Sequence, residues 1–344
     1  MSVDTVSFER LEDFRVGHVS DLAGGTGCTV VLCGDGAVAG VAVRGGSPST
    51  RETDALDPAI ARKSVHAVLL AGGSAYGLDA AAGVMKYLEE RGIGRNVGVG
   101  VVPIVCGAVL FDLGCGDPAA RPDVAMGYAA CEDAARSSAS SRYGNADATS
   151  HPGSVPCGNV GAGTGATVGK ALGRTRAMKG GFGAICLAVD ELVVGAILAV
   201  NCVGDVVADA AEAGRTLAGV RGETPGSFLN AEACILARRA ERRDFFSGEN
   251  TIIGAVMTNA SLTKAEASRL ASVAHDGIAR AVRPAHTAWD GDTIFALSKG
   301  EINADPDAVG ILAVRAVELA VRRAVLDAAS AFGFPAASDW AAER

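Results

Sequence analysis

The chain has 344 residues, of which 49% are hydrophobic and 20% charged, and its formal net charge is −8. This hydrophobicity excludes a disordered chain, and the acidic balance argues against nucleic acid or an anionic membrane surface as the main partner. The longest apolar stretch, residues 97–111, contains glycines and a proline and is shorter than a membrane-spanning helix requires.

The first third of the chain predicts short buried strands separated by glycine turns. Apolar runs at 29–33 and 37–43 flank Gly34-Asp35-Gly36, a turn sequence that predicts a β-hairpin. Further elements follow in chain order: a strand at 66–70, a helix at 75–90, and a strand at 97–110 that Pro103 interrupts.

The rest of the chain continues to mix strands with helices, after a polar segment at 137–158 that predicts a long loop. Its predicted elements are strands at 184–189, 191–200, 251–258 and 293–297, a helix from the capping box Thr263–Glu266 to 281, and a helix from Pro306 to 331. No internal repeat or linker divides the chain. We therefore expect one α/β or α+β domain, with sheets covered by helices.

Nine cysteines and five histidines are scattered along the chain, without the spacing of metal ligands. With no basic-then-apolar leader at the N-terminus, the cysteines are interpreted as reduced core thiols of a cytoplasmic protein. We expect neither a metal site nor a cofactor.

The segment 158–170 is the richest in glycine and ends at Lys170. It does not match a phosphate-binding loop, because Thr164 and Ala171 stand where that motif needs glycine and a hydroxyl residue. Two interpretations remain open. The glycines either allow close backbone packing, or they let the backbone approach a ligand beside the charge of Lys170.

A polar turn runs straight into a buried strand at Asn250-Thr251. Thr251 is either an ordinary β-branched residue that starts a strand, or the nucleophile of a self-cleaving chain. In the second case its hydroxyl attacks the preceding peptide bond. The freed α-amine, with a reference pKa near 8, then activates the hydroxyl without a histidine.

Asp290-Gly291-Asp292 comes directly before the strand predicted at 293–297. It is either a turn that satisfies its own backbone, or a pair of carboxylates on one face that orient a hydroxyl and an ammonium group. His286, a few residues earlier, is interpreted as a hydrogen-bonded structural residue rather than a base.

Taken together, these segments resemble the P1-family, DmpA-like self-processing aminopeptidases of peptidase family S58, which include the nylon-oligomer hydrolases. The matching segments lie in the expected order and are residues 70–79, 161–170, 199–205, 250–259 and 286–293. The resemblance implies a four-layer α/β/β/α sandwich, similar to the Ntn hydrolases but differently connected. It also implies one self-cleavage, giving an N-terminal chain 1–250 and a C-terminal chain 251–344 that stay associated.

The same resemblance implies roles for individual residues. Thr251 matches the nucleophile, Asn250 the residue before the cut, and Asn201 the asparagine that polarises the substrate carbonyl. Lys170, Asp290 and Asp292 match polar residues around the nucleophile in the nylon-hydrolase branch. The implied substrate pocket includes Phe111, which stands where characterised members have a tyrosine, together with Tyr76 and Gly163.

The leading hypothesis is a self-processing amidase that cleaves small amides, N-terminal peptide bonds or ω-amino-acid (6-aminohexanoate-type) oligomers through acyl-Thr251. By resemblance, we expect a homo-oligomer, a tetramer of processed heterodimers, that acts on a small molecule. Two alternatives remain. One is an acyltransferase of the ornithine-acetyltransferase type, and the other is a non-catalytic binder of a small ligand.

Overall fold

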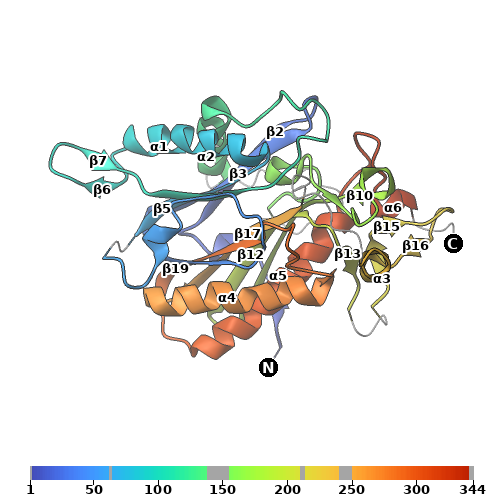
Figure 1. Ribbon diagram of the computed structural model, residues 1–344. Coiled ribbons are helices and arrows are strands. Elements are labelled where there is room, and N and C mark those ends of the chain that lie inside the picture. Colours follow the sequence, from blue (N-terminus) through green and yellow to red (C-terminus); the bar gives the residue numbers. More distant parts are fainter. Residues whose placement is uncertain (1, 62–63, 138–154, 210–213, 240–249, 341–344) are drawn as a thin grey trace.

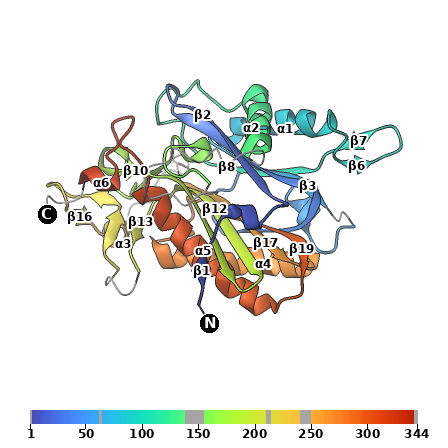
Figure 2. The same cartoon turned by 180° about the vertical axis from the view of Figure 1, so that it is seen from behind.

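The computed structural model describes residues 2–61, 64–137, 155–209, 214–239 and 250–340. In this part of the chain, two sheets that share one strand lie face to face between two pairs of helices (Figures 1 and 2). Residues 138–154, most of the segment predicted as a long loop, lie outside the described residues.

The first sheet is built from the most continuously apolar strands. Its order is β1 (Asp4–Thr5), β11 (Gly181–Val189), β12 (Leu192–Asn201), β17 (Thr251–Ala260), β19 (Thr293–Ile302) and the second half of β3 (Thr26–Val43). Neighbouring strands are antiparallel, except that β17 and β19 are parallel. Nearly every residue of β12 and β17 is buried, as predicted for strands without a polar alternation.

The second sheet contains the first half of β3. Its members are β2 (Arg15–Asp21), β3, β5 (Val65–Ala71), β8 (Val105–Val109) and β4 (Thr50–Arg51). Because β3 is one strand of 18 residues, the hairpin predicted at Gly34-Asp35-Gly36 is wrong. Gly34 and Gly36 have φ of +57° and +124°, and the pairing register with β5 shifts there. The glycines form an irregularity at which β3 passes from one sheet to the other.

Two pairs of helices cover the outer faces of the sheets. They are α4 (Lys264–Ala281) and α5 (Pro306–Leu326) on the first sheet, and α1 (Ala80–Glu89) and α2 (Val124–Ser137) on the second (Figure 1). The predicted capping box of Thr263 and Glu266 is present. The helix predicted at 75–90 begins as a 3-10 turn, η3 (Ser74–Asp79), and α5 ends at Leu326 rather than at 331.

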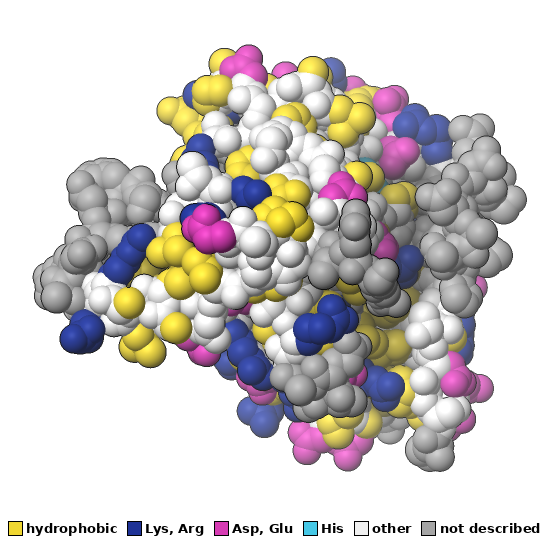
Figure 3. Space-filling view, turned by 90° about the vertical axis from the view of Figure 1, so that its right-hand side faces the viewer, with side chains coloured by type: hydrophobic (Ala, Val, Ile, Leu, Met, Phe, Trp, Pro, Cys, Tyr) yellow, Lys and Arg dark blue, Asp and Glu magenta, His cyan; other side chains and the backbone are white. Residues whose placement is uncertain are grey.

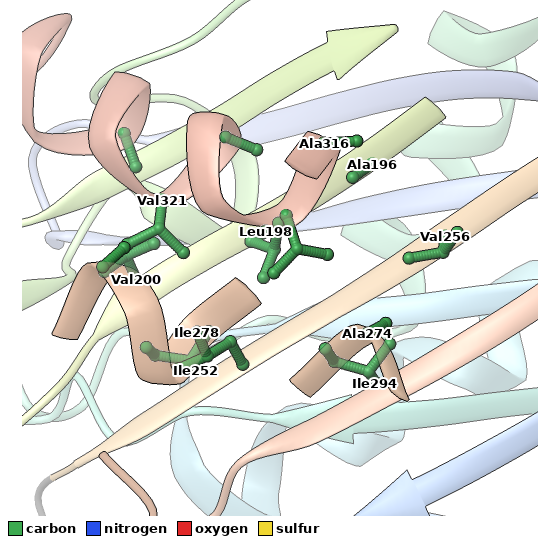
Figure 4. Close-up of a cluster of buried hydrophobic side chains, with 14 of the residues drawn as sticks. Ala196, Leu198, Val200, Ile252, Val256, Ala274, Ile278, Ile294, Ala316 and Val321 are labelled. Carbon is green, nitrogen blue, oxygen red and sulfur yellow. The ribbon is translucent and has the colours of Figure 1, made fainter. Parts of the chain in front are cut away.

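Hydrophobic cores fill the three spaces between these four layers. The first lies between α4, α5 and the first sheet, and Figure 4 shows side chains from both helices and from β12, β17 and β19 meeting there. The second lies between the sheets, and the third between the second sheet and α1 and α2. Glycine lets helix and sheet approach closely, since a Cβ on Gly183 would lie 1.9 Å from the carbonyl oxygen of Ala320. The expected α/β/β/α arrangement is confirmed.

Shorter elements connect these layers. The strands are β6 (Arg95–Asn96), β7 (Val101–Val102), β9 (Thr167–Val168), β10 (Met178–Lys179), β13 (Asp205–Val207), β14 (Thr216–Ala218), β15 (Val220–Arg221), β16 (Phe228–Leu229) and β18 (Val282–Arg283). The helices are η1 (Phe8–Arg10), η2 (Asp54–Leu56), η4 (Gly161–Gly163), η5 (Arg174–Arg176), α3 (Ala231–Ala237) and α6 (Ala337–Trp340). Among the helices described, none is long and apolar enough to cross a membrane.

Candidate active site

Three chain segments meet at Thr251, the first residue of β17. In the antiparallel ladder Thr251 pairs with Asn201, the last residue of β12. On the other side Asn250 forms a bridge with Asp290, just before β19. Because parallel strands begin at the same edge of a sheet, the turn before β19 lies beside the start of β17. Residues far apart in the sequence are thereby brought together.

The hydroxyl of Thr251 lies against the peptide bond that precedes it. Its Oγ1 donates a hydrogen bond to the carbonyl oxygen of Asn250. The backbone N–H of Gly291 donates to the same oxygen at 3.0 Å. Thr251 and Asn250 are only 4% and 3% exposed. The hydroxyl therefore adjoins a buried carbonyl that the Gly291 N–H polarises, and this backbone donor can stabilise negative charge on the carbonyl oxygen.

Asp292 connects the start of β17 to the turn before β19. Its Oδ1 accepts the backbone N–H of Ile252 at 2.7 Å. Its Oδ2 accepts from His286 twice, at 2.7 Å from Nδ1 and at 3.2 Å from the backbone nitrogen. The carboxylate is 1% exposed, so these donors replace the water that it lacks.

Asp290 has one occupied oxygen and one open oxygen. Its Oδ2 accepts from the backbone nitrogen and the hydroxyl of Thr287, at 2.8 and 2.7 Å. Its Oδ1 is buried without a hydrogen-bond partner among the described residues. Burial, reinforced by the nearby charge of Asp292, raises the pKa of Asp290 to about 6. Asp290 thus has the open acceptor and the raised pKa that a general base requires.

Lys170 and Asn201 form a buried pair opposite Thr251. Lys170 Nζ donates to Oδ1 of Asn201 at 2.8 Å and to its carbonyl oxygen at 3.1 Å. Asn201 Oδ1 also accepts the backbone N–H of Thr167 at 2.9 Å, and its Nδ2 donates to the carbonyl of Phe111 at 3.0 Å. The positive charge of Lys170 also acts on Asp290, where it opposes the rise in pKa.

A shallow, narrow pocket opens on the Lys170 side of this cluster. Its lining combines cationic, acidic and apolar side chains from three segments of the chain: Phe111, Asp112, Gly114, Cys115, Gly165, Thr167, Lys170, Arg174 and Phe334. The guanidinium of Arg174 lies 5.8 Å from the centre of the Phe111 ring. In this conformation the enclosed part of the pocket has room for little more than a water molecule, so it marks where polar and apolar side chains meet beside Lys170 and does not by itself define a substrate.

The other two residues expected in the pocket lie elsewhere. Tyr76 is 55% exposed, and the guanidinium of Arg121 lies 3.7 Å from the centre of its ring. Gly163 is buried in η4, where its carbonyl accepts from Lys179 Nζ at 3.2 Å. Neither residue lines the pocket beside Lys170, so a role for them in binding stays a prediction.

Sequence reasoning did not find Lys179, Asp112 or the backbone donor at Gly291. Lys179 is completely buried and donates to the carbonyls of Gly163, Ala166 and Gly180, so it fixes the glycine-rich loop that leads to Lys170. Burial lowers the pKa of Lys179 to about 8 and raises that of Asp112 to about 6. Only the fold reveals these contacts, because no local sequence pattern specifies them. Within the described residues no group of histidine, cysteine and acidic side chains is arranged to hold a metal ion.

Several solved structures share the fold of this chain, and two of them are aminopeptidases by name. A β-aminopeptidase of a Burkholderia species has a TM-score of 0.62 at 18% identity, over 94% of this chain and 86% of that chain. An L-aminopeptidase D-Ala-esterase/amidase from Ochrobactrum anthropi, described as a variant of the Ntn hydrolase fold, also has a TM-score of 0.62 at 18% identity, over 95% and 88%. The chain thus has an Ntn-hydrolase-like fold.

The sequence comparisons define the family. The model of peptidase family S58 matches residues 11–337, and the chain belongs to that family. An uncharacterised aminopeptidase of Mycobacterium leprae is 42% identical, over 97% of this chain and 94% of that protein. A 6-aminohexanoate-oligomer endohydrolase of Paenarthrobacter ureafaciens is 32% identical, over 81% and 71%. The protein is a hydrolase that acts on amide or peptide bonds, which confirms the resemblance seen in the sequence.

Proposed function

We propose that the protein cleaves itself once between Asn250 and Thr251, and that the new N-terminal threonine then hydrolyses small amides. The observation that carries this proposal is the buried Thr251 hydroxyl against the Asn250 carbonyl, with Gly291 N–H on the same oxygen and the open oxygen of Asp290 nearby. A threonine that only started a strand would not need these donors or the buried acidic pair.

Self-cleavage is an N-to-O acyl shift followed by hydrolysis. Thr251 Oγ1 forms an ester bond with the carbonyl carbon of Asn250, the C–N bond breaks, and the hydroxyl proton passes to the leaving nitrogen. The Gly291 N–H stabilises the negative oxygen of the tetrahedral intermediate. Water then hydrolyses the ester, which leaves a carboxylate on Asn250 and a free amine and hydroxyl on Thr251.

In the mature enzyme the same hydroxyl attacks a substrate amide. Its proton passes through the α-amine of Thr251 to the leaving amine, an acyl-Thr251 ester forms, and water releases the acid. Asp290 would hold the new ammonium group with its open oxygen. Asn201, fixed by Lys170, would polarise the substrate carbonyl.

Two observations support chains 1–250 and 251–344 remaining together after the cut. The shorter chain supplies β17, β19, α4 and α5, and β17 pairs with β12 of the longer chain while β19 pairs with β3. Two hydrophobic cores contain side chains from both chains. Separation would expose these cores to water, so the processed protein is one folded unit.

For the substrate we propose short amides, N-terminal peptide bonds or ω-amino-acid oligomers, in line with the names of the relatives. The Phe111 ring offers no hydroxyl to the substrate, which favours an apolar acyl chain at that point of the pocket.

Homo-oligomerisation remains part of the proposal. On the face that carries α3 and α6, Lys and Arg side chains are scattered among acidic and uncharged ones (Figure 3). Among the described residues of this face, basic side chains do not gather into the continuous patch that binds nucleic acid (Figure 3).

We also propose that the protein works in the cytoplasm. None of the nine cysteines forms a disulfide bond, and most are buried. Burial raises the pKa of Cys33 and Cys131 above the range in which thiolates form. Buried thiols without disulfide bonds are typical of proteins in a reducing compartment.

Self-cleavage should slow as the pH falls through about 6. Because the pKa of Asp290 is raised to about 6, the carboxylate is the main form above that pH and loses its charge below it. If Asp290 is the base, the rate should fall about tenfold for each pH unit below 6. The check is to synthesise the chain in a cell-free system, dilute it into buffers from pH 4.5 to 8, and follow the cut on denaturing gels. A flat profile would contradict the role of Asp290.

Lys170→Met should lower turnover about a hundredfold or more while the protein stays folded. The substitution keeps the length of the side chain but removes the donor that holds Asn201 and the charge that acts on Asp290. Lys86→Met is the matched control, because that lysine side chain is 65% exposed and distant in the fold. Equal turnover in both variants would mean that Lys170 only packs.

The test of the proposed function is to trap the acyl-enzyme. Purified protein is mixed with alanine p-nitroanilide or 6-aminohexanoate trimer, and the reaction is quenched in acid within the first turnovers. The mass of each chain is then measured by mass spectrometry. We expect the added acyl mass on the chain 251–344 and, after digestion, on its first residue. Hydrolysis with the adduct elsewhere, or transfer of an acetyl group from acetyl-ornithine to glutamate, would contradict the proposal.

A further inference from the structure

His286 contacts the candidate site through one residue, Asp292. Its φ is +56°, in the left-handed region that residues other than glycine rarely adopt. This conformation directs both its backbone N–H and its Nδ1 to the same oxygen, Oδ2 of Asp292. Asp292 already accepts a backbone N–H on each of its oxygens, so Nδ1 is the donor in the third contact. A non-glycine residue held in this conformation is often part of a functional site.

The position of His286 does not suit a base for Thr251. Nδ1 is occupied by Asp292, while Nε2 is buried and has no hydrogen-bond partner in the described part of the chain. Behind it the His275 ring packs edge-on, with centroids 4.9 Å apart. Burial lowers the pKa of His275 to about 4, so that ring is neutral. Any effect of His286 on the reaction therefore passes through Asp292.

We propose that His286 is a positioning residue: it holds Asp292, which in turn holds the backbone N–H of Ile252 and thereby the place of Thr251. This inference rests on the proposed self-cleavage, and goes beyond it by assigning a residue that acts only after the cut. The chain of contacts is continuous, from His286 Nδ1 to Asp292 Oδ2 at 2.7 Å and from Asp292 Oδ1 to Ile252 N at 2.7 Å.

The cut makes this chain of contacts important. Before cleavage, Thr251 is held through both of its neighbours in the chain. The carbonyl of Asn250 accepts from Gly291 N–H, and the N–H of Ile252 donates to Asp292. After cleavage that carbonyl belongs to the end of the other chain, and Thr251 becomes a chain terminus. Free termini lose order unless they are tied down. The bond from Ile252 to Asp292 then holds the residue next to the nucleophile. A displacement of about 1 Å at a reacting group can cost about a hundredfold in rate.

The test is a set of three substitutions at His286. Asn adopts the left-handed conformation readily and places its amide nitrogen near the position of Nδ1, so His286→Asn should keep kcat within about threefold. His286→Phe keeps the ring but has no donor, and His286→Gln places its donor beyond Nδ1. Both should lower kcat about tenfold or more with KM nearly unchanged, while self-cleavage slows less than about threefold. Assays use alanine p-nitroanilide or 6-aminohexanoate trimer.

His66→Phe is the matched control. His66 is buried, and its ring makes one hydrogen bond, in which Nδ1 accepts from Ile104 N–H at 3.0 Å. His66 lies in β5, whose first residue pairs with Ala37 of β3. The candidate site lies near the start of β19, which pairs with Val43 at the far end of β3. His66 is therefore distant from the site. We expect His66→Phe to lower the melting temperature without changing kcat.

The outcomes separate this inference from the proposed function. If the wild type is cut and active, and His286→Phe and His286→Gln keep kcat while only their melting temperatures fall, His286 is merely structural and the inference is wrong. A loss in His286→Asn as large as in His286→Gln also overturns it. If the wild type is neither cut nor active on either probe, the proposed function itself has failed. Should His286→Phe not fold, the comparison of His286→Asn with His286→Gln decides.

Discussion

Thr251→Ala should accumulate as one folded, inactive chain. The substitution removes the only atom that can form the ester with Asn250 and leaves a methyl group in a site that is 4% exposed. Loss of a nucleophile costs at least about a thousandfold in turnover, whereas a small truncation of this kind costs on the order of 1 kcal/mol of stability. Mass spectrometry reports whether the chain is cut, and an activity assay reports turnover. The melting temperature reports stability, so the three measurements separate the loss of the nucleophile from the loss of stability.

Thr251→Ser is the matched variant for that experiment. It keeps the hydroxyl and loses only a methyl group, so we expect it to be cut, at a different rate, and to hydrolyse amides. An alanine variant cut at the same bond as the wild type would mean that an outside protease is responsible. A serine variant that stays intact while it folds normally would mean that the hydroxyl is not sufficient for the reaction.

Asp290→Asn should abolish most turnover and yet stabilise the uncut protein at high pH. The amide can still accept from Thr287, but it has no charge with which to act as a base or hold an ammonium group. We expect a loss of about a hundred- to ten-thousandfold in turnover. The stability effect follows from the raised pKa of Asp290, about 6 against 3.8 in the unfolded chain.

The sign of that stability effect can be stated. A carboxyl whose pKa is raised in the folded state favours folding at low pH, and this contribution is lost as the pH rises from about 4 to above 6. In a Thr251→Ala background, which stays uncut, Asp290→Asn should therefore raise the melting temperature more at pH 8 than at pH 4. Asp292→Asn should lower it, because that residue accepts from Ile252 and His286 on both oxygens. The same direction of change in both variants would contradict the different roles assigned to the two residues.

The local elements of this fold could be predicted because their signals are short. Residues 251–258 have no polar alternation and form a strand buried on both faces. The Thr263 capping box and Pro306 mark the starts of α4 and α5. The hairpin at 34–36 was wrong because glycine pairs serve bulges in long strands as well as turns, and only the pairing partners of β3 distinguish the two.

Which residues the structure brings together at the candidate site could be predicted in part. A polar turn before a buried strand pointed to Thr251, and the acidic pair before the next strand pointed to Asp290 and Asp292. Strand alternation, however, would have put both carboxylates on one face, whereas β19 begins only at Thr293 and the two bind different donors. The pairing of Asn201 with Thr251 depends on the register of β12 against β17, and the contact of Lys170 with Asn201 depends on how the glycine-rich loop packs against the end of β12; no local pattern contains either.

The most direct test of the account is the intact mass of the purified wild-type protein beside that of Thr251→Ala, expressed in the same way. Self-cleavage predicts two chains for the wild type, whose summed mass exceeds that of the uncut chain by one water, with the shorter chain beginning at Thr251. It predicts one chain for Thr251→Ala. A single wild-type chain that hydrolyses amides, or two chains from the alanine variant meeting at Asn250 and residue 251, would contradict it.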